Sequence, residues 1–182
     1  MNTVKHISIC ADDFGITNKV DKAIIELILN KRVTETSCMV LTQNFKKSSK
    51  ELKKILVNFG KGIHITFTDF NSLTSPKGIT KNGKFLSLQS LFLEILKNNI
   101  SRYEVYNEVK SQIDFFEQTM DCKPDFIDGH HHIHQLPVIR DVILIPQGAI
   151  TNGNNGSDEL DVSIGTASGG AQIKAAGALL DG

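Results

Sequence analysis

The sequence has no excess of charge of either sign, because 20 lysines and arginines balance 20 aspartates and glutamates among 182 residues. It also has no dense basic stripe, so the electrostatic footprint of a nucleic-acid-binding protein is missing. A neutral or mildly polar small substrate fits this composition better. With 40% hydrophobic and 22% charged residues, the chain is typical of one globular domain with a substantial core.

Cysteines and long hydrophobic runs are also scarce. Cys10, Cys38 and Cys122 are odd in number and widely spaced, which argues against a disulfide framework and against a cysteine zinc site. Free thiols predict a cytoplasmic location. The first ten residues contain a single lysine and no long apolar run before Asp12 and Asp13, so we expect neither a signal peptide nor a membrane span.

Short apolar segments alternate with amphipathic segments along most of the chain. Apolar runs and β-branched residues predict strands at residues 6–10, 33–41, 63–68 and 125–128. Apolar residues at helical spacing predict helices at residues 17–31, 52–59, 88–97 and 101–120. This alternation predicts the α/β class, as a partial or irregular (β/α) barrel whose parallel strands alternate with helices.

Two segments lack such periodicity. Residues 69–87 are rich in glycine, asparagine and lysine, and we expect a long loop that faces the substrate. Residues 146–182 are rich in glycine, asparagine, alanine and serine and contain no aromatic residue. We therefore predict one domain at residues 1–145, followed by a tail of unknown structure.

Carboxylates and imidazoles occur at the ends of three predicted strands. Asp12 and Asp13 follow the first strand, and His64 lies on the third. Four histidines follow the fourth strand: His130, His131, His132 and His134. Because the carboxyl ends of parallel strands meet on one face, these side chains can gather around one ion, and a carboxylate with two imidazoles is a competent ligand set.

Each signal also has a plainer interpretation. The pair Asp12 and Asp13, taken alone, is typical of a solvated, helix-capping turn. A lone histidine in a strand, such as His64 or His6, is more often a structural residue than a ligand. The histidine-rich run at residues 128–134 differs, since so many imidazoles together are improbable as packing, and there metal binding is the favoured interpretation.

Three segments together resemble the motifs of the YdjC/ChbG-like carbohydrate deacetylases. They are ADDFG at residues 11–15, G-x-H-x-x-x-T at residues 62–68 and D-G-H-H-H-I-H-x-x-P at residues 128–137. Their order and spacing match, and the resemblance runs from about Val4 to Ile143. It implies a hydrolase that removes acetyl groups from N-acetylated sugars such as chitooligosaccharides, as in chitin degradation. The implied partner is a small carbohydrate, not a nucleic acid or a membrane.

The same resemblance implies roles for individual residues. Asp13, His64 and His130 would hold one divalent metal ion, with magnesium favoured and zinc close behind, and Asp12 would be the catalytic base. Further residues would contact the substrate or orient the ligands: Asp128, His131, His132, His134 and Thr68.

The chain departs from this family in its length. Members are considerably longer, and a later histidine-bearing segment of theirs looks like the source of the general acid, whereas no histidine follows His134 here. His132 or His134 is then the candidate acid. A barrel without its late strands would leave an open sheet edge. Two copies of the chain could cover that edge by pairing, so a homodimer is one expected outcome. Two other functions stay open: a non-catalytic remnant that binds a metal or a sugar, and another metallohydrolase such as a phosphoesterase.

Overall fold

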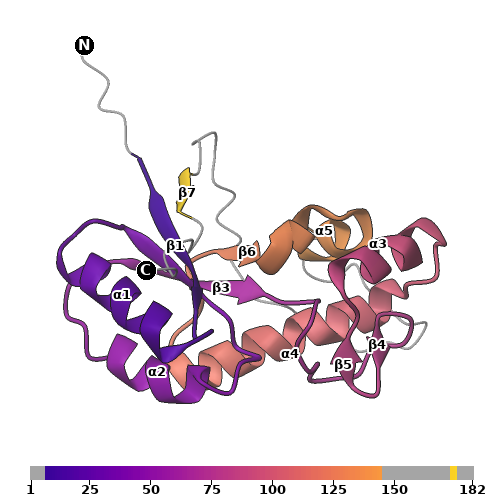
Figure 1. Ribbon diagram of the computed structural model, residues 1–182, viewed down its shortest axis with the longest axis horizontal. Helices are drawn as coiled ribbons and strands as arrows, with labels where there is room; N and C mark the ends of the chain where they lie inside the picture. Colours follow the sequence, from indigo (N-terminus) through magenta and orange to yellow (C-terminus); the bar gives the residue numbers. More distant parts are fainter. Residues whose placement is uncertain (1–6, 145–172, 176–182) are drawn as a thin grey trace, which may run out of the picture.

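The computed structural model describes residues 7–144 and 173–175, which form a parallel sheet covered by helices (Figure 1). The strand order in the sheet is β6-β3-β2-β1-β7, and every pair of neighbouring strands is parallel. The strands are β1 (Ile9–Phe14), β2 (Glu35–Cys38), β3 (Gly60–Ile65), β6 (Ile127–Gly129) and β7 (Ile173–Ala175). The predicted α/β class, with a partial barrel of parallel strands, is confirmed.

Helices follow these strands along the chain, and some of them lie against the sheet (Figure 1). They are α1 (Asn18–Leu29), α2 (Phe45–Leu52), α3 (Leu88–Leu96), α4 (Arg102–Met120), the short 3-10 helix η1 (His130–Gln135) and α5 (Pro137–Leu144). Three of them begin at residues whose hydroxyl accepts a backbone N–H: Thr17 for α1, Ser87 for α3 and Ser101 for α4. Such caps satisfy donors that the first helical turn leaves free. No helix in the part of the chain that the structure describes is long and apolar enough to cross a membrane.

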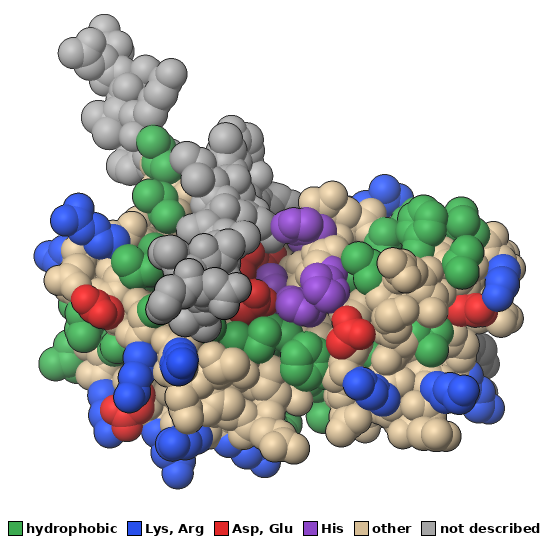
Figure 2. Space-filling model, viewed as in Figure 1, with side chains coloured by type: hydrophobic (Ala, Val, Ile, Leu, Met, Phe, Trp, Pro, Cys, Tyr) green, Lys and Arg blue, Asp and Glu red, His purple; other side chains and the backbone are tan. Residues whose placement is uncertain are grey.

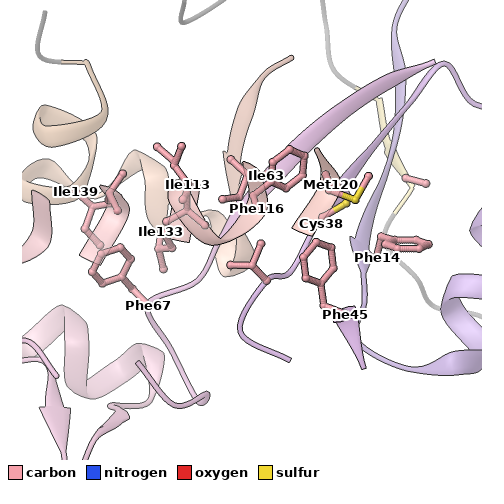
Figure 3. Packing of buried hydrophobic residues seen from close by; sticks show 14 of the residues in the cluster. Phe14, Cys38, Phe45, Ile63, Phe67, Ile113, Phe116, Met120, Ile133 and Ile139 are labelled. Carbon is pink, nitrogen blue, oxygen red and sulfur yellow. The ribbon is translucent and has the colours of Figure 1, made fainter. Parts of the chain in front are cut away.

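The core fills the space between the sheet and the helices, and Figure 3 shows its apolar side chains pointing toward one another. Phe14 of β1, Phe45 of α2 and Phe116 of α4 are completely buried. The rings of Phe45 and Phe116 are nearly parallel, with centroids 6.5 Å apart. Burying one such side chain stabilises a fold by about 1.5–3 kcal/mol. This packing fixes the strands, and therefore the polar side chains at their ends.

The predicted strand boundaries shift in the structure. The first strand was expected at residues 6–10 but runs to Phe14, because burial of Phe14 draws Asp12 and Asp13 into the strand. The second is shorter than its predicted range of 33–41, and the fourth begins two residues later and ends one residue later than expected.

The third strand, expected at residues 63–68, ends at Ile65. The side-chain amide of Gln112 explains this end. Its Oε1 accepts the backbone N–H of Thr66 at 3.0 Å, and its Nε2 donates to the Thr66 carbonyl at 2.8 Å. The Gln112 side chain of α4 therefore binds the backbone groups of Thr66 that a neighbouring strand would otherwise bind.

The helix predicted at residues 52–59 is wrong. Helix α2 lies earlier in the chain and ends at Leu52. Its buried anchors are Phe45 and Leu52, seven positions apart and on the same face, whereas Leu56 is 98% exposed. The spacing of apolar residues therefore predicted this helix too late in the chain.

The expected loop at residues 69–87 contains a hairpin of β4 (Thr80–Lys81) and β5 (Lys84–Phe85). Its turn is Asn82-Gly83, with positive φ at both residues, the usual chemistry of a two-residue hairpin turn. The fully buried Glu108 of α4 holds the preceding segment by accepting the backbone N–H groups of Leu73 and Thr74. The segment is thus tied to α4.

Parts of the predictions fall outside the described residues. His6, which was interpreted as structural, lies there, as does most of the predicted tail at residues 146–182. Within the tail, the described residues Ile173–Ala175 pair with β1. The boundary at residue 145 stays a prediction.

Candidate metal centre

Polar side chains from four strands meet at the carboxyl end of the sheet. Strand β1 contributes Asp12 and Asp13, β2 contributes Ser37, β3 contributes His64 and β6 contributes Asp128. His130 follows directly at the start of η1. Figure 2 shows histidine side chains gathered on one face with acidic side chains beside them.

Three of these residues bring their ligand atoms together. Asp13 Oδ1 lies 3.0 Å from His130 Nδ1 and 3.3 Å from His64 Nε2, and the ligand atoms of all three lie within 4.8 Å of one another. Two ligands that are each about 2.1 Å from one tetrahedral ion lie about 3.4 Å apart. The distances therefore fit a shared cation, and a carboxylate with two imidazoles is compatible with magnesium, manganese or zinc.

The backbone at this centre adopts strained conformations. Asp13, His131 and His132 have φ values of 65°, 53° and 57°, in the left-handed region that non-glycine residues rarely adopt. The two histidines form a kink inside η1. Residues in such conformations persist only where the surroundings impose them, and they cluster at functional sites.

Two motif glycines have steric reasons. Gly15, just after Asp13, has a φ of 101°, which favours glycine. At Gly62, two residues before His64, a Cβ atom would lie 2.4 Å from the ring of Phe126. Both glycines let the chain place Asp13 and His64, the candidate ligands, where they are.

His64 is held from behind by a carboxylate and a hydroxyl. Its Nδ1 lies 2.7 Å from Asp128 Oδ1 and 3.1 Å from Ser37 Oγ, and Ser37 also donates to Asp128 Oδ2 at 3.1 Å. His64 and Asp128 are both buried, 3% and 4% exposed. A carboxylate on the far nitrogen fixes the orientation of a metal-binding imidazole and raises its basicity.

These contacts shift the protonation equilibria of the cluster. Burial disfavours the charged form of His64, but the hydrogen bonds to Asp128 and Asp13 outweigh it and raise the pKa of His64 to about 9. Burial likewise opposes ionisation of Asp13, yet hydrogen bonds to His130 and His64 hold the pKa of this carboxyl well below its usual range. Without a metal, His64 is therefore a cation between two carboxylates at neutral pH.

Metal binding should consequently release a proton. A cation at Nε2 requires an unprotonated nitrogen, so we expect the affinity to rise about tenfold per pH unit up to about pH 9. In the metal-free protein the sign is opposite: the folded pKa of His64 exceeds the unfolded value, so its stabilisation is complete below about pH 6.5 and is lost as the pH rises through 9. Calorimetric metal titrations in two buffers of different ionisation enthalpy test this. Heats that do not depend on the buffer would contradict it.

Asp12, the predicted base, lies beside the cluster. It is half-buried, and its Oδ1 lies 3.4 Å from Ser37 Oγ. Cys10 is close by, with its thiol 4.0 Å from Ser37 Oγ. Burial, together with Asp128 and Asp12, raises the pKa of Cys10 well above its usual range. A thiol held in its neutral form makes Cys10, Asp12 and Asp128 a poorer cation site than the group around Asp13.

The other predicted site residues lie around the centre. The His131 ring stacks on that of His130 with centroids 4.0 Å apart, and its Nδ1 lies 3.0 Å from Oγ1 of the buried Thr68. Burial and the neighbouring His130 lower the pKa of His131. The rings of His132 and His134 meet edge to face at 6.2 Å. The structure thus brings Thr68 to His131, while His132 and His134 form a separate pair.

Sequence reasoning missed Ser37, because the second strand was predicted at residues 33–41 and Ser37 lies in the middle of that range. In the structure β2 ends at Cys38, which brings Ser37 close to the carboxyl end of the sheet. Its hydroxyl contacts His64, Asp128 and Asp12 at once. It therefore belongs to the polar shell that supports the ligands.

Replacing Ser37 by alanine should weaken metal binding about tenfold, because partners that orient a ligand are typically worth that much or more. The matched control is Ser49→Ala, which removes a buried hydroxyl of α2 that donates to the Lys46 carbonyl. Isothermal titration with zinc or manganese gives both affinities, and circular dichroism checks the fold. Equal affinities of the two variants would refute a role for Ser37 in the metal centre.

Comparison with known proteins places the chain among relatives of one kind. A family model described as YdjC-like protein matches residues 6–146. A chitooligosaccharide deacetylase of Proteus mirabilis is 29% identical over 133 residues, which cover 73% of this chain and 51% of that protein. A carbohydrate deacetylase of Vibrio campbellii is 32% identical over 137 residues, which cover 72% of this chain and 53% of that protein.

A solved structure from Enterococcus faecalis V583, described as a cellobiose-phosphate cleavage protein, has the same fold with a TM-score of 0.60 and 28% identity. The match covers 75% of this chain and 53% of that one. This chain spans about half the length of the curated relatives it matches.

Proposed function

The chain belongs to the YdjC-like family, and from this premise we propose that it is a metal-dependent carbohydrate deacetylase acting on N-acetylated sugars such as chitooligosaccharides. The observation that carries the proposal is the convergence of Asp13, His64 and His130, with Asp13 Oδ1 3.0 and 3.3 Å from the two imidazoles. The names of the relatives from Proteus mirabilis and Vibrio campbellii support the reaction type. The free thiols of Cys10, Cys38 and Cys122 fit a reducing compartment, and we propose the cytoplasm.

The reaction splits an acetamide with water into acetate and an amine. One divalent cation, magnesium or zinc, held by Asp13, His64 and His130, would polarise the carbonyl and make water a better nucleophile at neutral pH. Asp128 and Ser37 orient His64 toward that cation, through the 2.7 and 3.1 Å contacts to its Nδ1.

Proton transfer then falls to residues around the centre. Asp12 takes the proton from the attacking water, because it is a half-exposed carboxylate next to the ligand Asp13. His132 or His134 returns a proton to the departing amine. Thr68 and His131, which lie 3.0 Å apart through Oγ1 and Nδ1, contact the substrate.

A second candidate is cleavage of a phosphorylated disaccharide. It is favoured by the description of the Enterococcus faecalis structure as a cellobiose-phosphate cleavage protein, and an Asp/His metal set also supports phosphoester hydrolysis. A third is a remnant that binds a metal or a sugar without turnover, since the chain spans about half of its relatives.

One assay separates these functions. The purified chain is incubated with N,N′-diacetylchitobiose, with N-acetylglucosamine and with cellobiose 6-phosphate, each with magnesium or zinc, and acetate, reducing sugar and phosphate are measured. The proposal expects acetate from the acetylated sugars alone. Products from cellobiose phosphate without acetate from the others favour the second candidate, and no product with metal bound favours the third.

A further inference from the structure

The turn that follows Asp13 is held by two side chains that have no part in the chemistry above. Asp21 of α1 accepts the backbone N–H of Gly15 through its Oδ1 at 2.6 Å. The hydroxyl of Thr42, which lies between β2 and α2, donates to the Gly15 carbonyl at 2.5 Å. Gly15 is thus bound at both of its backbone polar groups, two positions after a candidate metal ligand.

Strand β1 is irregular at the same point. The pairs Ala11–Thr36 and Phe14–Cys38 enclose two residues of β1 but only one of β2. Such an extra residue is a β-bulge, which bends a strand and re-aims a side chain, often beside an active site. Asp13 lies in this bulge, with a φ of 65°. The direction of its carboxylate therefore depends on an irregular stretch of backbone.

The left-handed backbone of Asp13 persists only where its surroundings impose it. Two backbone hydrogen bonds close the turn: Ile16 N–H donates to the Asp13 carbonyl at 3.1 Å, and Met39 N–H donates to the Phe14 carbonyl at 2.8 Å. Gly15 lies between these contacts, where a Cβ atom would be only 3.1 Å from the Met39 carbonyl oxygen. The two side chains that bind Gly15 therefore restrain the backbone of the ligand residue as well.

Asp21 is buried, 3% exposed, which is costly for a carboxyl unless hydrogen bonds satisfy it. Burial raises the pKa of Asp21, against the hydrogen bonds from Ser48, Gly15 and Asn44. The side-chain amide of Asn44, at the start of α2, donates to Oδ2 at 2.5 Å. One carboxyl oxygen thus faces the turn after Asp13 and the other faces α2, so their roles can be tested separately.

We propose that Asp21 and Thr42 are positioning residues of the metal centre, which hold Gly15 and thereby keep the carboxylate of Asp13 directed at the cation. This inference rests on the metal centre of the proposed function, and it assigns a task to two residues outside the ligand group. Both act through the backbone of the turn. The affinity for the metal, and not only the stability of the fold, should therefore depend on them.

The test measures two quantities for the full-length wild type and four variants: zinc affinity by calorimetric titration, and stability by urea unfolding of the metal-free protein. Asp21→Ala removes the acceptor for the Gly15 N–H and should weaken zinc binding about tenfold. Asp21→Asn keeps an oxygen for that N–H and should bind zinc as the wild type does. Thr42→Val keeps the shape of the side chain but loses the hydroxyl, and it should weaken zinc binding several-fold.

The matched control is Asn44→Ala, which removes the donor to the other oxygen of Asp21 and leaves Gly15 bound. It should lower the urea midpoint, as Asp21→Ala does, but keep the zinc affinity of the wild type. The proposal is overturned if folded Asp21→Ala binds zinc as tightly as the wild type, or if Asn44→Ala weakens zinc binding as much as Asp21→Ala. If Asp21→Ala does not fold, Thr42→Val decides, and an unchanged zinc affinity in that variant overturns the proposal.

Failure here and failure of the deacetylase proposal are distinguishable. Weaker zinc binding by Asp21→Ala, without acetate release by the wild type, keeps the positioning role and refutes the deacetylase. Acetate release by the wild type, with equal zinc affinity in the wild type and Asp21→Ala, refutes the positioning role alone. A wild type that binds no zinc overturns both.

Discussion

Replacing Asp12 by asparagine is expected to lower kcat for acetate release by about three orders of magnitude, within the range that general bases contribute. Asparagine keeps the size of the side chain and an oxygen close to Ser37 Oγ, but it cannot take a proton. Because Asp12 is outside the group of Asp13, His64 and His130, metal affinity should be unchanged. Acetate production and zinc titration on the same sample provide both readouts.

The control for Asp12→Asn is Asp114→Asn. Asp114 pairs with Lys110 at the surface, four positions along α4, and such pairs contribute little. It should retain the wild-type kcat. Full activity of Asp12→Asn would remove Asp12 from the mechanism, and loss of metal from this variant would make Asp12 a ligand instead.

The second large effect is expected for His64→Ala, which should weaken metal binding by at least about two orders of magnitude. Structural zinc sites with four ligands bind with about 10–16 kcal/mol, hence about 3 kcal/mol per ligand. Acetate release at limiting metal should fall with it. The substitution also leaves the buried carboxylate of Asp128 without its imidazole partner, so the metal-free variant should be less stable than the wild type.

A matched control for His64→Ala is His132→Ala, since His132 is exposed and outside the group of Asp13, His64 and His130. It should bind the metal as the wild type does. Because His64→Ala risks misfolding, His64→Gln is measured beside it, and circular dichroism reports the fold of both. A folded His64 variant with wild-type metal affinity would contradict the assignment of His64 as a ligand.

The predictable part of the fold is the part that local pattern decides. Alternating apolar strands and amphipathic helices predicted the parallel α/β arrangement, and the helices at 88–97 and 101–120 were placed to within one residue. The boundaries that failed depend on tertiary contacts. Gln112 of α4 ends β3 by bonding to the backbone of Thr66, and no local pattern around residue 66 contains that information.

The candidate site, like the fold, could be predicted from the sequence only in part. The rule that parallel strands converge at their carboxyl ends predicts that Asp13, His64 and the histidine run lie close together. It did not identify Ser37, because the predicted second strand, residues 33–41, continues beyond Ser37, whereas β2 ends at Cys38. Its role becomes visible only when Asp128, ninety-one positions away, lies 3.1 Å from its hydroxyl.

The most direct test of the account is a titration of activity with metal. The chain is stripped with chelator, metal is returned in small portions, and acetate release from N,N′-diacetylchitobiose is measured at each step. The account predicts no acetate from the stripped protein, and a rate that rises with added magnesium or zinc until one ion per chain is bound. Acetate release that is indifferent to chelator would contradict the claim that Asp13, His64 and His130 hold a catalytic cation.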